Sequence, residues 1–275
     1  MMHNTFTWKS VGKTLFGQQW TPDTAPKAVI ILVHGHGEHS GRYAHVARYL
    51  NAHGIAVLTY DHFGHGKSEV KRGHVPSYEA VMNSITEMLA RAASTFPGLP
   101  RFLFGHSMGG NFVTNYALFH QPEVQGVILS APWLRLAFAP KPVDVWLAKI
   151  MVHIYPSFTQ STKLDATAIS RDPAEVKRYV DDPLIHDKIS PVLFLRTYEA
   201  GLRALAHAAT FPYPLLLAHG TADRLTSFEA SKEFAASIQG DATFVPWEGL
   251  FHEMHNEPEQ QEVMALYKDW MLARA

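Results

Sequence analysis

The feature that most constrains the fold of this chain is a glycine-flanked serine between an apolar segment and a helical pattern. Residues Arg101–Phe104 lead directly into Gly105-His-Ser107-Met-Gly109. The pattern G-x-S-x-G is weak alone, but between a strand and a helix it is typical of a sharp turn that raises a serine hydroxyl above a sheet. Gly105 and Gly109 fit this interpretation because a Cβ there would collide with a neighbouring strand or helix. The alternative is a glycine-rich turn without chemistry.

Apolar segments and helical patterns alternate along the chain on both sides of this turn. Ala28–Val33 is continuously apolar and Ile55–Tyr60 nearly so, as expected of strands that are covered on both faces. Apolar residues at helical spacing follow each of them, in residues 43–50 and 81–92. This alternation predicts a mostly parallel, doubly wound sheet flanked by helices. Residues 5–20 alternate around a glycine and predict an antiparallel hairpin at the sheet edge.

The alternation stops at Pro132 and resumes near residue 209. Residues 133–208 contain helical stretches rich in Trp, Pro and Ala but no regular succession of strands. We therefore expect one α/β core, made of residues 1–132 and 209–275, with a helical cap inserted after the sixth strand.

The C-terminal part of the chain repeats the core pattern. Strands are expected at Leu215–Ala218 and Thr243–Pro246, with a helix between them near residues 228–238. In the final helix, Asn256 and Glu259 resemble a capping box at its start.

Composition excludes several classes of protein. Of 275 residues, 47% are hydrophobic and 18% charged, which is ordinary for a globular domain. The net charge of -1 offers no surface for nucleic acid, and the absence of cysteine excludes a thiolate nucleophile or metal site. No signal-peptide pattern opens the chain, and no apolar run approaches the ~18 residues of a membrane span. We therefore expect a cytoplasmic protein, with any membrane contact peripheral.

Two later residues have the chemistry that a catalytic serine requires, namely a base and a group that holds the base. Asp223 follows one predicted strand and His252 follows the next. Ligand-binding residues gather at the carboxyl ends of the strands of an open parallel sheet, where both would lie. Ser107, Asp223 and His252 also occur in the chain order of the α/β-hydrolase triad. We predict that the three form a catalytic triad.

Each triad partner has a rival. His255 is a second candidate base, but it lies nearer the final helix. Asp241 is a second candidate acid, but it enters the last strand at its amino end, on the opposite edge of the sheet.

Two backbone N–H groups are predicted to stabilise a developing oxyanion. The first belongs to Met108, directly after the serine, and the second to His36, in the loop after the strand that ends at Val33. Glycines on both sides of His36 allow that loop to approach a substrate oxygen closely.

Six segments form a set of motifs that spans nearly the whole chain. They are His34–Tyr43, Asp61–Ser68, Gly105–Gly110, Leu129–Trp133, His219–Asp223 and Gly249–Glu253. This set resembles the monoacylglycerol lipase and lysophospholipase branch of the α/β-hydrolases.

The resemblance implies an α/β-hydrolase fold and a serine carboxylic-ester hydrolase that needs no cofactor. Monoacylglycerol is the first candidate substrate, cleaved to a fatty acid and glycerol through an acyl-enzyme. It also implies Ser107, Asp223 and His252 as the triad, with His36 and Met108 as oxyanion donors. His36 departs from the family, in which a small residue is common at that position.

Several alternatives stay open. A lysophospholipase, a general carboxylesterase or an aminopeptidase of this fold would use the same triad. His34, His36 and His39 resemble a metal-binding cluster, which would suit a zinc-dependent hydrolase. A non-catalytic binding module is a further alternative, although such relatives usually lack a triad member.

The cap decides what reaches the serine. Pro142–Tyr155 is apolar around most of its circumference, which predicts either a helix packed on the core or a mobile lid. A lid would contact lipid with its outer face and line an acyl tunnel with its inner face, to which Trp133 and Phe138 would contribute. The expected partner is a single-chain amphipathic ester with transient membrane contact; the sequence specifies no oligomeric state.

Overall fold

The computed structural model describes all 275 residues and contains the predicted alternation of strands and helices. The elements are β1 (Met2–Ser10), β2 (Lys13–Thr21), β3 (Ala28–Val33), α1 (Ala44–Ala52), β4 (Ile55–Tyr60), α2 (Tyr78–Thr95), β5 (Arg101–His106), α3 (Met108–His120), β6 (Gly126–Ser130), α4 (Pro142–Ile154), β7 (Gln160–Ser161), α5 (Pro173–Asp181), β8 (Lys188–Ile189), α6 (Pro191–Ala206), β9 (Leu215–Gly220), α7 (Phe228–Ser237), β10 (Ala242–Trp247) and α8 (Gln260–Leu272). Short 3-10 helices lie at Ser40–Tyr43, Ala166–Ala168, Ala208–Thr210 and Met254–Asn256.

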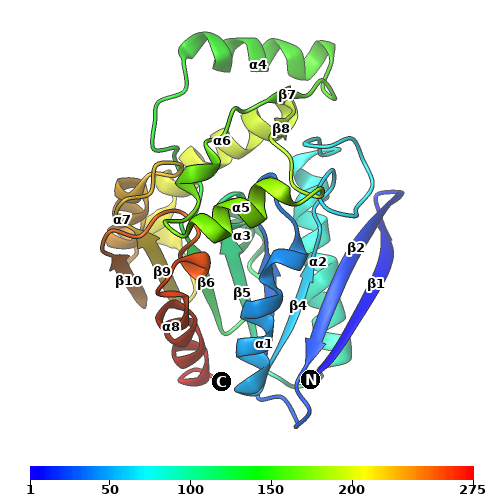
Figure 1. Ribbon diagram of the computed structural model, residues 1–275, viewed down its shortest axis with the longest axis vertical. Helices are drawn as coiled ribbons and strands as arrows, with labels where there is room; N and C mark the ends of the chain where they lie inside the picture. The colour runs from blue at the N-terminus through cyan, green and yellow to red at the C-terminus, as the bar shows by residue number, and fades with distance from the viewer.

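The central sheet has eight strands in the order β1-β2-β4-β3-β5-β6-β9-β10 (Figure 1). β1 pairs with β2 and β2 with β4 in antiparallel fashion, and every other pair is parallel. The predicted edge hairpin and the predicted parallel sheet are both confirmed. Because the parallel strands share one direction, the loops that follow β3, β5, β9 and β10 open at the same edge of the sheet.

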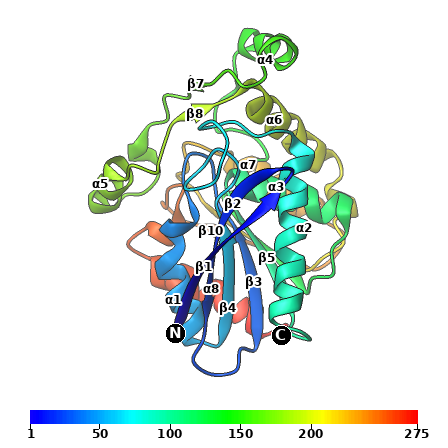
Figure 2. The ribbon, with the colours of Figure 1, turned by 90° about the vertical axis from the view of Figure 1, so that its right-hand side faces the viewer.

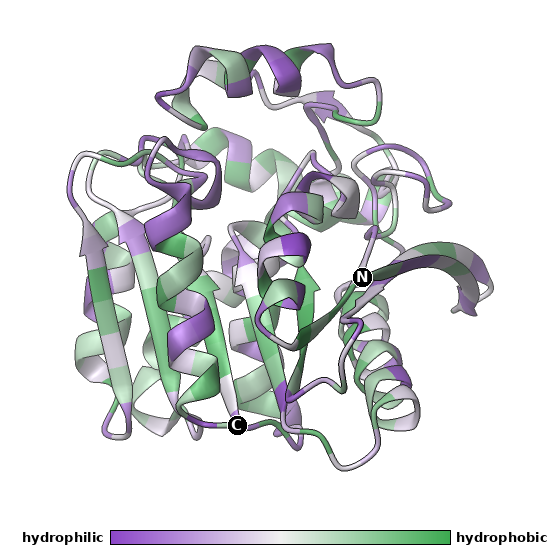
Figure 3. Cartoon of the chain, turned by 60° about the horizontal axis from the view of Figure 1, so that its bottom comes forward, coloured by the Kyte–Doolittle hydropathy of each residue, from purple (hydrophilic) through white to green (hydrophobic).

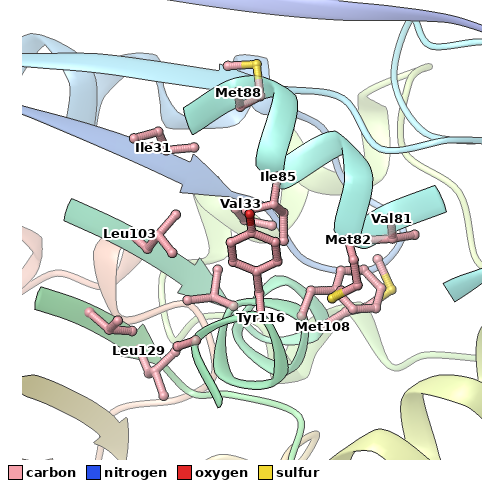
Figure 4. Close-up of a cluster of buried hydrophobic side chains, with 14 of the residues drawn as sticks. Ile31, Val33, Val81, Met82, Ile85, Met88, Leu103, Met108, Tyr116 and Leu129 are labelled. Carbon is pink, nitrogen blue, oxygen red and sulfur yellow. The ribbon is translucent and has the colours of Figure 1, made fainter. Parts of the chain in front are cut away.

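Helices cover both faces of this sheet. α1 and α8 lie on one face, and α2 and α3 lie on the other (Figure 2). The strands between them are strongly apolar (Figure 3), as sandwiched parallel strands must be. Figure 4 shows one of these interfaces, where β3, β5 and β6 meet α2 and α3 around Ile85 and Tyr116. The buried sheet is thus a rigid support for the loops at its edge.

The segment predicted as a cap lies beyond the carboxyl ends of the strands (Figures 1 and 2). It contains α4, α5 and α6 and a two-stranded ribbon of β7 and β8. α6 packs on α3, and α4 packs on α6. The division of the chain at residues 133 and 208 stays a prediction.

α4 is the helix predicted at Pro142–Tyr155, and most of its surface is exposed. Only Ala148 is buried, whereas Trp146 is 59% and Ile154 is 72% exposed. α4 thus packs on α6 and, through Val152, against the core, but leaves most of its surface exposed; whether it moves as a lid stays a prediction. None of the helices combines the length and the apolar character that a membrane crossing requires.

The predicted capping box of the last helix is wrong. α8 begins at Gln260, four residues after Asn256, and has no side-chain cap. Asn256 donates instead to Glu253, and Glu259 pairs with Arg171. Glu259 is the residue that directly precedes α8, but its carboxylate and the Asn256 amide are taken up by these other partners and cap no backbone N–H of the helix.

Candidate active site

Ser107 occupies a strained turn between β5 and α3. Its φ of 53° and ψ of -118° are rare for a residue with a Cβ, so the surroundings must enforce them. A Cβ on Gly105 would lie 2.6 Å from the carbonyl oxygen of Gly109, and one on Gly109 would lie 2.1 Å from that of Val33. Both glycines are therefore required for α3 to approach β5 and β3 this closely, as the sequence predicts.

Asp223 lies in the loop after β9, and its side chain is fully buried. Its Oδ1 accepts the N–H groups of Leu225 at 2.7 Å and Thr226 at 3.1 Å. Its Oδ2 accepts from His252 Nδ1 at 2.7 Å, from His219 Nε2 at 3.0 Å and from the Thr226 hydroxyl at 2.8 Å. Burial disfavours the charge, but His252 and His219 outweigh it and hold the pKa of Asp223 well below its usual range. The carboxylate is ionised.

His252 lies in the loop after β10 and is oriented by Asp223. Because the carboxylate can only accept, Nδ1 carries the proton and Nε2 of the neutral ring is an acceptor. Burial lowers the pKa of His252, but Asp223 more than compensates, so the pKa lies above its ordinary value. The imidazole is thus suited to accept a proton at Nε2 and to hold it.

The structure brings His252 beside the serine turn without bonding it to the serine. Its ring lies 4.7 Å from the ring of His106, the residue before Ser107. The hydrogen bonds of His252 are made by Nδ1, and none joins Nε2 to Ser107 Oγ. Such bonds are often long in a free enzyme and shorten when substrate binds.

The predicted oxyanion loop lies against the serine. A Cβ on Gly35 would lie 3.1 Å from Ser107 Cβ. Met108 is the first residue of α3, so its N–H has no partner one turn earlier in the helix. The side chain of His36 points to the cap, where its Nε2 lies 2.9 Å from the carbonyl oxygen of Lys188. The residue that departs from the family therefore joins the loop to β8.

A buried arginine ties the loops of the site together, and the sequence reasoning missed it. Arg42 binds both oxygens of Glu253 at 2.6 Å, Glu38 at 3.1 Å and Glu175 of α5 at 2.8 Å. Glu38 accepts the N–H of Gly35 at 2.6 Å. One guanidinium thus connects the predicted oxyanion loop, the residue after His252 and α5. Burial opposes ionisation of Glu253, but Arg42 lowers its pKa to about 2.

The aromatic residues predicted for an acyl tunnel have different surroundings. Trp133 is buried, its backbone N–H donates to the Ser107 carbonyl at 2.8 Å, and its ring lies 6.5 Å from that of Phe194. Phe138 is 59% exposed. Trp133 is therefore the one that borders the serine turn.

The rival residues have other partners. His255 is buried and stacks on Tyr43 at 4.9 Å, and burial holds its pKa well below the ordinary value. Asp241 pairs with Arg274 at the amino end of β10. The ring of His255 also lies 5.0 Å from that of His106, but neither of its nitrogens has a hydrogen-bond partner, so no carboxylate orients it as Asp223 orients His252.

The zinc alternative is wrong. His34 bonds to Gly35 and to the N–H of His62, His36 to β8, and His39 to Asp182. No three His, Asp or Glu side chains lie where they could share one metal ion.

Comparison with known proteins identifies the family. The family model described as serine aminopeptidase, S33, matches residues 24–259. The chain belongs to this family of serine hydrolases. A monoacylglycerol lipase of Mycolicibacterium smegmatis is 36% identical over 92% of this chain and 91% of its own. A crystal structure of a monoacylglycerol lipase from Paleococcus ferrophilus matches with a TM-score of 0.88 and 35% identity, over 95% of this chain and 99% of the other. The predicted α/β-hydrolase fold is confirmed.

One further relative has a different name. A phospholipase of Bacillus subtilis is 30% identical over 89% of this chain and 94% of its own.

Proposed function

We propose that this protein is a serine esterase that hydrolyses monoacylglycerols to a fatty acid and glycerol. The observation that carries the proposal is the buried Asp223–His252 hydrogen bond beside the strained turn at Ser107. The similarity to monoacylglycerol lipases over nearly the full length supports the choice of substrate.

In the first half of the reaction, the Ser107 oxygen attacks the ester carbonyl carbon while His252 Nε2 takes the hydroxyl proton. Asp223 stabilises the imidazolium that forms. The negative oxygen of the tetrahedral intermediate is held by the N–H groups of Met108 and His36, and each such donor is worth roughly 3–4 kcal/mol of barrier. His252 then gives the proton to the departing glycerol oxygen, which leaves the acyl group on Ser107.

In the second half, water replaces the glycerol. His252 takes a proton from the water as its oxygen attacks the acyl carbonyl. Collapse of the intermediate releases the fatty acid, and the proton returns to the Ser107 oxygen. The same donors stabilise both intermediates, so one site serves both halves.

α4 is proposed to contact the lipid surface from which the substrate comes. Its exposed apolar residues are of the kind that interfacial helices insert below the headgroups. They are Val143, Trp146, Leu147 and Ile154. We place the protein in the cytoplasm with transient attachment at membranes, and place Trp133 at the entrance of an acyl tunnel under the cap.

Lysophospholipids are the second candidate substrates. The similarity to a phospholipase favours them, and a single acyl chain would occupy the same tunnel. A general carboxylesterase would accept short soluble esters equally well, whereas the exposed apolar face of α4 favours a lipid substrate.

A hydrolysis panel tests the proposal. We expect fatty acid release from monoacylglycerol to exceed release from di- and triacylglycerol, lysophosphatidylcholine and an aminoacyl amide. Ser107→Ala is expected to abolish it, while Ser94→Ala, at an exposed serine of α2, leaves it unchanged. Faster cleavage of lysophosphatidylcholine would favour the second candidate. Full activity of Ser107→Ala would refute the mechanism.

A further inference from the structure

Asp223 is shared by two histidines, and the triad uses only one of them. His219 Nε2 donates to Oδ2 at 3.0 Å, the same oxygen that accepts from His252 Nδ1 at 2.7 Å. With the Thr226 hydroxyl at 2.8 Å, this oxygen accepts three hydrogen bonds. Three donors divide the charge of a single oxygen, so each of them affects the strength of the bond to His252.

His219 is itself held in one orientation. It is the fifth residue of β9, is completely buried, and lies between Asp223 and Ser231 of α7. Its Nδ1 lies 2.8 Å from Ser231 Oγ. Because Nε2 must carry the proton that it shares with the carboxylate, Nδ1 of the neutral ring accepts the Ser231 hydroxyl. The Ser231 hydroxyl thereby selects the tautomer that donates to Asp223.

A buried histidine with a purely structural role needs only some partner for each nitrogen, and backbone carbonyls commonly serve. Here one nitrogen is directed at the catalytic carboxylate instead. Gly220, the next residue, lies so close to the loop of His252 that a Cβ on it would be 2.3 Å from the Leu250 carbonyl. His219 therefore lies at the junction of the two loops that carry the acid and the base.

We propose that His219, held by Ser231, is a positioning residue for the acid of the triad: its N–H directs Oδ2 toward His252 and weakens the pull of the carboxylate on the imidazolium. The proposal rests on the proposed role of Asp223 and His252. How readily His252 takes and returns a proton then depends on His219 in β9 as well as on Asp223 in the loop that follows this strand.

The effect would be visible in the pH dependence of the reaction. Removal of the His219 N–H leaves more charge on Oδ2, so the imidazolium becomes more stable and the pKa of His252 rises. A base that holds its proton more tightly returns it to the leaving group less readily. The ionisable groups around His252 are Asp223, Glu253, Glu38, His106 and His255, and of these only Asp223 is hydrogen-bonded to His219.

Two amide substitutions separate the bonds that His219 makes. The amide nitrogen of glutamine stands as many bonds from Cα as Nε2 does, so His219→Gln keeps a donor for Asp223. The amide of asparagine stands as many bonds from Cα as Nδ1 does, so His219→Asn reaches Ser231 and leaves Asp223 without this donor. His219→Leu removes both bonds, and Ser231→Ala removes only the bond between Ser231 and His219 Nδ1.

The measurement is kcat and kcat/KM against pH on a soluble monoacylglycerol, with Tm recorded for each variant. We expect His219→Gln to stay within about threefold of the wild type, and His219→Asn to lose roughly tenfold in kcat, the value of one charge-assisted hydrogen bond. In the pH profile of kcat/KM, the acid limb should move to higher pH in His219→Asn and His219→Leu but not in His219→Gln. Ser231→Ala should shift it in the same direction by less.

Equal losses in the glutamine and asparagine variants, in proportion to Tm and with an unmoved acid limb, would overturn the proposal and leave His219 a structural residue. If the leucine variant does not fold, the comparison of glutamine with asparagine decides alone. Failure of the triad itself is recognised separately, because Ser107→Ala would then remain active whatever the variants at His219 do.

Discussion

The replacement of Asp223 by asparagine is expected to disable the site with little change in shape. The carboxylate has two unlike sides, since Oδ1 accepts two backbone N–H groups and Oδ2 accepts from two imidazoles and a hydroxyl. An amide has one acceptor and one donor, so only one of these sides can keep its partners. The backbone N–H groups of Leu225 and Thr226 can only donate, whereas an imidazole can change its tautomer and so exchange its donor and acceptor nitrogens. The amide oxygen should therefore remain with the backbone.

The amide NH₂ then faces His252 and forces its proton from Nδ1 to Nε2. In that tautomer Nε2 is a donor and cannot accept the proton of Ser107. The wrong tautomer costs about 10⁴ in kcat in a comparable triad, which is about 5 kcal/mol of barrier. We expect Asp223→Asn to lose activity on this scale.

The assay is the steady-state hydrolysis of a p-nitrophenyl ester at neutral pH, with circular dichroism and Tm as folding controls. Asp241→Asn is the matched control, because Asp241 pairs with Arg274 at the opposite end of β10. It is expected to retain wild-type activity. A loss of less than tenfold in a folded Asp223→Asn protein, or an equal loss in Asp241→Asn, would refute the reasoning.

Three further predictions concern the rest of the site. In the wild type, kcat/KM should rise with pH through an apparent pKa above the ~6.5 of an ordinary imidazole, because Asp223 stabilises protonated His252 and only the neutral ring is a base; an acid limb at or below that value contradicts this. Gly109→Ala places a Cβ 2.1 Å from the Val33 carbonyl and should lower the free energy of unfolding by roughly 1–3 kcal/mol, as overpacking does, which urea denaturation measures. Arg42→Met leaves the buried carboxylates of Glu38 and Glu253 without a cationic partner and should lower the free energy of unfolding by roughly 3–5 kcal/mol; a loss below about 1 kcal/mol would show that the network contributes little.

The sequence predicts the part of this fold that depends on local patterns. Apolar runs identify the strands because a parallel sheet is covered on both faces, and Gly105 and Gly109 identify the turn because no other residue fits there. Asp223 and His252 were predicted from their positions after strands, and in the structure Asp223 Oδ2 lies 2.7 Å from His252 Nδ1. Their catalytic roles stay a prediction.

Other features depend on contacts between distant segments, which local patterns do not contain. Arg42 binds Glu253, which is 211 positions away in the sequence. His39 binds Asp182, which is 143 positions away, and is therefore not directed toward His34 and His36 as a metal cluster would require. The capping box failed for the same reason, because Arg171 is a partner for Glu259 that no local pattern reveals. The exposure of α4 likewise depends on where the cap lies over the sheet.

The most direct test of the account is to find which residue reacts with a fluorophosphonate. The catalytic serine oxygen of a serine hydrolase attacks the phosphorus of this reagent and releases fluoride, which leaves a stable adduct. Intact-mass and peptide mass spectrometry should show one adduct per chain, on the peptide that contains Ser107, and none in Ser107→Ala. An adduct on any other residue, or undiminished labelling of Ser107→Ala, would contradict the claim that this serine is the nucleophile.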